Sequence, residues 1–142
     1  MTSRILPAAM VLGLMTAPGF ASTICSADTM AGIWIGGDMH STCRLNFQEN
    51  GRVRGFCNDY DEYWHDGQWY YVVERAAIRG GYTLDAECSI RVRVNAEFEN
   101  GETDRVILHG RVTSSAGTAP DMAIFSMGPR ADFALNLTFH RD

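Results

Sequence analysis

The sequence contains no lysine, and its twelve basic residues are all arginine. We attribute this absence to the codon usage of a GC-rich genome, although the arginine guanidinium also suits planar, bidentate contacts. The chain has no excess of basic residues either, since 17 acidic side chains outnumber them. Nucleic acids and anionic lipids both require a basic surface, so this balance argues against either as the partner.

Long hydrophobic runs are missing after the first residues. Arg4 is followed by an apolar run from Ile5 to about Met15 and then by Gly-Phe-Ala, which is the pattern of a secretory signal peptide. The run is shorter than the roughly 20 apolar residues of a membrane-spanning helix. We therefore expect residues 1–21 to be a signal peptide cleaved after Ala21, and lipid attachment at Cys25 is disfavoured by the preceding Ile24.

Cleavage removes 21 of the 142 residues and leaves 121, with 11 arginines against 17 acids and a net charge of −6. A chain of this length forms one domain, residues 22–142. We expect it to be exported by a bacterium to the periplasm or beyond, with no insertion of the mature chain into a membrane.

The sequence has no Cys-x-x-Cys motif, which leaves little support for a zinc site or for thioredoxin-like redox chemistry. All four cysteines follow the predicted signal peptide, and an even number in an oxidising compartment indicates disulfides. The candidates are Cys25, Cys43, Cys57 and Cys88. No metal and no cofactor is expected.

Catalytic motifs are also missing. There is no Gly-x-Ser-x-Gly and no His-Glu-x-x-His, and the four histidines are scattered along the chain. Strand parity places His109 and His140 on the outside, and Glu97 and Glu99 share the polar face of one segment. We expect a protein that is not an enzyme.

What the sequence does contain is alternation. In Thr42–Cys57, the residues Cys43, Leu45 and Phe47 alternate with polar ones, and a second alternating run follows Asn50-Gly51, whose residues favour the positive φ of a tight turn. A three-residue loop with a glycine bulge places Cys43 opposite Cys57, whereas a two-residue loop offsets them. Cys43–Cys57 is the first choice for a disulfide, and Cys57–Cys88 is its competitor.

The same alternation of apolar and polar residues recurs in further segments, which are separated by turn signals. No segment after the signal peptide shows the apolar periodicity of an amphipathic helix. The clearest strands are Cys88–Phe98, Val106–Val112 and Phe133–Phe139, and weaker ones are Gly32–Gly36, Trp69–Arg75, Ala77–Leu84 and Met122–Met127. Eight or nine short strands predict an all-β fold, either a single up-and-down antiparallel barrel of about eight strands with disulfides or a β-sandwich. Consecutive hairpins favour the barrel.

Two families resemble parts of this chain. Gly32-Ile33-Trp34 and the hairpin that follows look like the start of calycin-type barrels, the lipocalin and avidin superfamily. The resemblance implies a small exported barrel in which Trp34 helps to close one end.

The second resemblance is to bacterial periplasmic inhibitors of secreted metalloproteases, which are also small barrels. Residues 26–34, SADTMAGIW, and Cys43–Phe47 are similar to the first segments of that family. The resemblance implies that Ser22 and Thr23, exposed by cleavage, insert into a protease cleft. Cys25 has no counterpart there, and nothing aligns after about Cys57.

The longest irregular stretch, Asn58–Gly67, combines three aromatic rings with four acids and a histidine. Loops on a rigid barrel often carry recognition, and Tyr and Trp supply large contact areas. The predicted binding residues are Tyr60, Asp61, Tyr63, Trp64, His65 and Asp66. The alternative is that Tyr63 or Trp64 folds back to cap the barrel, and the spacing of the acids does not fit a calcium loop.

The sequence therefore predicts an exported, non-catalytic binding module that recognises a small ligand or a protein through the barrel mouth and this aromatic, acidic segment. The alternatives are an inhibitor of a secreted metalloprotease and a structural envelope protein.

Overall fold

The computed structural model describes residues 24–115, 119–127 and 137–142. The predicted signal peptide, Ser22, Thr23 and the first residues of the predicted strand Phe133–Phe139 lie outside these ranges. The elements, in chain order, are α1 (Ala27–Met30), β1 (Gly32–Gly37), β2 (Ser41–Phe47), β3 (Arg52–His65), β4 (Gln68–Leu84), β5 (Ser89–Phe98), β6 (Thr103–Thr113), β7 (Met122–Met127) and β8 (Leu137–Arg141).

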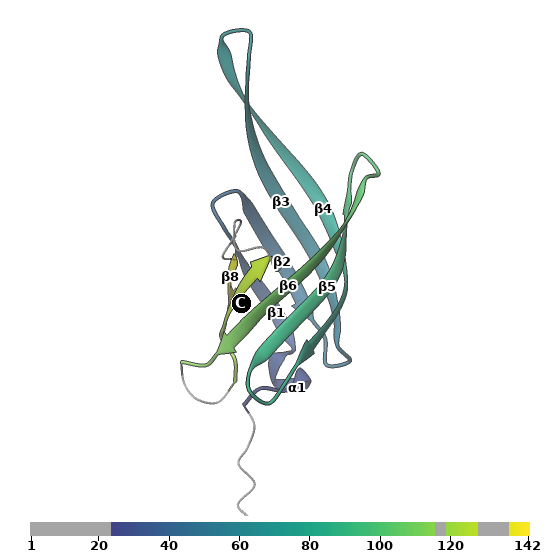
Figure 1. Ribbon diagram of the computed structural model, residues 1–142, viewed down its shortest axis with the longest axis vertical. Coiled ribbons are helices and arrows are strands. Elements are labelled where there is room, and N and C mark those ends of the chain that lie inside the picture. Colours follow the sequence, from purple (N-terminus) through teal and green to yellow (C-terminus); the bar gives the residue numbers. More distant parts are fainter. Residues whose placement is uncertain (1–23, 116–118, 128–136) are drawn as a thin grey trace, which may run out of the picture.

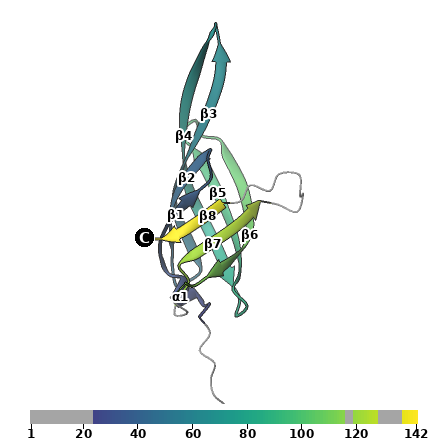
Figure 2. The same ribbon diagram turned by 90° about the vertical axis from the view of Figure 1, so that its left-hand side faces the viewer.

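The eight strands form a closed barrel in which each strand pairs antiparallel with the next (Figures 1 and 2). Pairing of β1 with β8 completes the circle. The predicted up-and-down barrel is confirmed, and the β-sandwich alternative is wrong. Closure leaves no free sheet edge around the barrel wall, which is how a soluble sheet of this kind avoids pairing with other chains.

Alternation fills the interior with apolar side chains. Along β5, every second residue from Ile90 to Ala96 is buried, and the residues between them are exposed. The largest side chains in the core are aromatic rings from four different strands, namely Trp34, Phe47, Phe125 and Phe139. Phe47 meets Trp34 and Tyr82 edge to face, and Phe125 meets Phe139 in the same way. The barrel is therefore a packed core and not an open tube.

The short helix α1 closes one end of the barrel (Figure 1). Met30 and Trp34 are both fully buried there, and the indole Nε1 of Trp34 donates to the Met30 carbonyl at 3.0 Å. Arg141 from the last strand donates to the carbonyls of Ala31 and Thr29 and lies over the Trp34 ring. A helix of four residues is too short to show an apolar stripe, which is why the sequence did not indicate it.

Two disulfides cross-link the fold, Cys43–Cys57 and Cys25–Cys88. The first confirms the preferred pairing, and the competitor Cys57–Cys88 is wrong. Cys43 lies directly opposite Cys57, as the three-residue loop requires. Only Gly51 of that loop has a positive φ, at 80°, so the expectation of positive φ at Asn50 was not met.

Hydrogen bonding explains how directly opposed cysteines can be bonded. The Gln48 N–H donates to the Arg52 carbonyl at 2.8 Å, and hydrogen-bonded pairs alternate with non-hydrogen-bonded pairs along an antiparallel ladder. Counting back from Gln48, Cys43 and Cys57 form a non-hydrogen-bonded pair, in which side chains approach most closely. Their Cα atoms are 4.0 Å apart.

Candidate functional site

β3 and β4 extend well beyond the strands on either side of them (Figure 1). β2 pairs with β3 only as far as Asp59, and β5 pairs with β4 only from Ala76 onwards. Residues 60–73 therefore form a two-stranded hairpin that projects from the end of the barrel opposite α1, and we call it the arm (Figure 1). Six facing pairs hold it together, from Tyr60 opposite Val73 to His65 opposite Gln68.

The arm ends in a tight turn whose residues match its geometry. Asp66 and Gly67 both have positive φ, at 48° and 80°, as a type I′ hairpin turn requires. Next to the turn, Trp64 meets Trp69 edge to face, and the rings of Tyr63 and Tyr70 stack with centroids 5.3 Å apart. Such cross-strand aromatic pairs stabilise a hairpin that has no neighbouring strand.

The two faces of the arm differ in composition because directly opposed residues share a face. One face, which continues the outer surface of the barrel, carries Tyr60, Glu62, Trp64, Trp69, Tyr71 and Val73. We call it the aromatic face. Trp64 and Trp69 are each 57% exposed, Val73 is 58% exposed and Tyr71 is 74% exposed. Rings of this size are seldom left in water without a partner.

Acidic residues gather where the arm leaves the barrel. Asp59 and Glu74 face each other, and Asp61 lies two residues along β3 on the same face. Partial burial raises the pKa of Asp59, while a hydrogen bond with Ser41 lowers it and repulsion from Asp61 and Asp38 raises it further. The base of the arm is therefore electronegative.

All six predicted binding residues lie on the arm or its turn, but the register divides them, with Tyr60 and Trp64 on the aromatic face and Asp61, Tyr63 and His65 on the opposite face. Their setting was predicted incorrectly, since Asn58–Gly67 is not an irregular loop and residues up to His65 belong to β3. The capping alternative is wrong as well, because Tyr63 is 49% exposed on the arm and Trp64 projects into solvent. The two weak strands Trp69–Arg75 and Ala77–Leu84 are parts of one long strand, β4.

Four residues of the aromatic face were missed, namely Glu62, Trp69, Tyr71 and Val73. The signal that predicts them is Asp66-Gly67, a favoured two-residue hairpin turn, with Trp64 two residues before it and Trp69 two residues after it. Read as a hairpin, this signal pairs Trp64 with Trp69 and places Tyr71 on the same face.

The arm offers aromatic rings and carboxylates to solvent. Among the described residues, no three His, Cys, Asp or Glu side chains are placed to hold a metal ion. All four cysteines are in disulfides. His65 Nε2 lies 3.3 Å from Asp66 Oδ2 at the exposed tip of the arm. Solvent-exposed rings and carboxylates are groups that can contact a binding partner.

Comparison with protein-family models, with curated proteins and with solved structures gives no match to this chain. Across the ranges that the structure describes, no helix has the length and apolar character needed to cross a bilayer. The two disulfides fit an extracellular or otherwise oxidising compartment.

Proposed function

We propose that this protein is an exported, non-catalytic binding module of the calycin-like barrel type, and that it captures a protein partner through the arm. The observation that carries the proposal is the aromatic face, which holds two tryptophans and two tyrosines in solvent on a hairpin that projects from a disulfide-bonded barrel. Two-stranded hairpins are marginally stable alone, so the barrel positions the arm. Trp and Tyr are the residues that most often dominate the free energy of protein association.

A protein fits the arm better than a small ligand does. Small-molecule sites are concave and enclose most of the ligand surface, whereas the arm is a projecting ribbon. The barrel interior, where calycin-type proteins are expected to hold a ligand, is occupied by Trp34, Phe47, Phe125 and Phe139. A protein surface can cover both Trp64 and Tyr71 at once.

The arm also indicates the character of the partner. Glu62 lies among the rings of the aromatic face and Asp66 lies at the turn, so a basic surface complements the arm, and arginine or lysine can lie over the aromatic rings. The outer edges of the arm pair with no other described strand beyond Asp59 and before Ala76. Such edges can accept an added strand from a partner.

The test compares capture by the intact protein with capture by Trp64→Ala/Trp69→Ala. Each protein is immobilised, exposed to the secreted and envelope fraction of the producing organism, and its bound proteins are quantified by mass spectrometry. Ile33→Ala/Ile35→Ala, on the outer surface of β1, is the control. We expect a saturable, basic partner that binds wild type and control equally and is lost with the arm variant.

An unchanged set of bound proteins for the arm variant would overturn the proposal. The same experiment separates it from protease inhibition. Deletion of residues 22–24 removes Ser22 and Thr23 and leaves the arm in place, so capture that depends on those residues assigns the partner to the N-terminus.

A further inference from the structure

Arginines are concentrated on the outer surface of four consecutive strands, β3 to β6. All of them are exposed, and we call this surface the arginine face. Its members are Arg52, Arg54, Arg79, Arg91, Arg93, Arg105 and Arg111.

The strand register arranges these arginines in neighbouring rows across the sheet. The rows are Arg54, Arg79, Asn95 and Arg105; Arg52, Gly81, Arg93 and Ile107; Thr83, Arg91 and His109; and Ser89, Arg111 and Ile124. No acidic residue occurs in any of the four rows. Arg54 and Arg79 are direct cross-strand neighbours, an arrangement of like charges that destabilises a sheet.

Within the described ranges, none of the seven arginines forms an ion pair within 4.0 Å, although Asp85 and Glu97 each line a hollow together with arginines of the face. The two ion pairs within 4.0 Å in the described ranges are Arg44–Asp142 and His65–Asp66, and neither involves the arginine face. Seven exposed guanidinium groups without an ion pair form a surface whose charge complements an anionic molecule.

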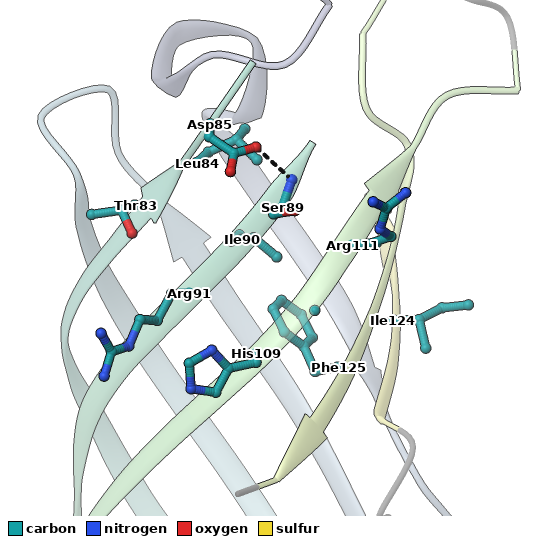
Figure 3. A pocket seen from close by; sticks show the side chains of 11 residues that line it. Thr83, Leu84, Asp85, Ser89, Ile90, Arg91, His109, Arg111, Ile124 and Phe125 are labelled. Carbon is teal, nitrogen blue, oxygen red and sulfur yellow. Dashed lines mark hydrogen bonds between the residues drawn. The ribbon is translucent and has the colours of Figure 1, made fainter. Parts of the chain in front are cut away.

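Two hollows lie side by side on this surface and share Thr83 and Arg91. The larger, of 710 Å³, lies among Arg91, His109 and Arg111 on β5 and β6 (Figure 3). The smaller, of 450 Å³, lies between Arg91 and Arg93 above Gly81, which has no side chain to fill it. One acid, Asp85, also lines the larger hollow, and its Oδ1 accepts the backbone N–H groups of Ser89 at 2.9 Å and Glu87 at 3.0 Å. Two adjacent hollows that share a cation suit two successive units of a polymer.

We propose that the arginine face binds an acidic polysaccharide. Strands about 4.8 Å apart and side chains about 6.6 Å apart along a strand give a regular array of charges. The guanidinium fork matches carboxylate and sulfate groups with two parallel hydrogen bonds. Thr83, Ser89 and Asn95 lie between the arginines and offer hydroxyl and amide partners for sugar hydroxyls.

Two other polyanions fit the face less well. Single-stranded nucleic acid binding relies on aromatic platforms for the bases, and the four rows contain no Phe, Tyr or Trp. A lipid surface is flat, whereas the outside of a closed barrel is convex and presents few of the seven arginines to a plane. A flexible chain can follow the curvature. This inference does not depend on the arm.

The experiment measures binding of heparin and of polygalacturonate by calorimetry, with neutral dextran as the ligand control. We expect both acidic polymers to bind, with affinity that falls as salt concentration rises. Arg79→Gln/Arg93→Gln should weaken binding by roughly tenfold or more, since it removes two charge-assisted contacts. Arg44→Gln, on β2 and outside the four strands of the face, removes a charge away from the face and should bind as wild type does.

Each alternative has its own outcome. No binding of either polymer at 150 mM salt, a value near physiological ionic strength, overturns the inference, and so does equal weakening by the two variants. Tighter binding of a single-stranded oligonucleotide or of anionic lipid vesicles assigns the face to those ligands instead. Thermal unfolding confirms that the variants are folded. Trp64→Ala/Trp69→Ala should bind heparin normally, so failure here and failure of the arm proposal are distinguishable.

Discussion

Asp59 lies at the last β2–β3 pair, and its environment makes the folded state sensitive to pH. Burial, together with Asp61 and Asp38, raises the pKa above the ordinary value of 3.8 despite the hydrogen bond with Ser41. The ionised carboxylate therefore destabilises the folded state. The associated stability is fully present below about pH 4 and is lost as the pH rises through the raised folded-state pKa.

Asp59→Asn should consequently be more stable than wild type at pH 7 and no more stable at pH 3. The gain at pH 7 should be below about 1 kcal/mol, because solvent screens a half-buried carboxylate. Thermal unfolding at the two pH values measures it, with Glu62→Gln on the exposed arm as the control. A loss of stability at pH 7 would show that the hydrogen bond with Ser41 outweighs the burial of charge.

At the scale of the element, the arm is a hairpin whose stability depends on its turn. Gly67 has φ of 80°, and a Cβ added there meets nothing within 4 Å, so a substitution costs only backbone conformation. Gly67→Ala should destabilise the arm by about 1 to 2 kcal/mol, the cost of a left-handed conformation for a residue with a side chain.

Amide hydrogen exchange locates this effect. Protection should fall for residues 60–73 in Gly67→Ala and stay unchanged for buried barrel residues such as Val92 and Leu108. Asp66→Asn, which keeps a residue that tolerates positive φ, is the matched control and should exchange as wild type does. Equal loss of protection in the barrel would mean that arm and barrel unfold together.

The elements that sequence predicts well are those with one buried face. β5 alternates from Ile90 to Phe98 because one side meets the core and the other meets water. The arm has no buried face, so its residues do not alternate, and Trp69-Tyr70-Tyr71-Val72-Val73 runs apolar without a break. Periodicity therefore indicates strands of the barrel wall and fails for a ribbon exposed on both sides.

At the scale of the whole molecule, the distribution of charge over the surface could not be predicted from the sequence either. The net charge of −5 describes the average of the chain, and the acids gather at the arm and in turns while seven arginines share one outer surface. Neighbours across strands depend on register, which alternation alone does not determine. The argument from net charge against anionic partners does not extend to this local surface.

The two disulfides constrain the whole chain to different extents. Cys25–Cys88 joins residues 63 apart, and Cys43–Cys57 joins residues 14 apart. If restriction of the unfolded chain dominates, the first contributes about 4 kcal/mol and the second about 3 kcal/mol. Cys25→Ser/Cys88→Ser should therefore lower the free energy of unfolding more than Cys43→Ser/Cys57→Ser does.

Urea unfolding of the two double variants, each with its remaining disulfide verified by mass, measures the difference. The larger loss for Cys25→Ser/Cys88→Ser should also include loosening of α1, which follows Cys25 directly. The opposite order would show that the covalent link between β2 and β3 matters more than chain restriction.

Closure of the barrel depends on a pairing between the first strand and the last. β1 pairs with β8, and Arg141 reaches carbonyls of Thr29 and Ala31 more than a hundred residues earlier. Contacts so distant in sequence form slowly. A polypeptide that emerges first residue first cannot close the barrel until β8 has emerged, so β1 remains paired with β2 alone until then.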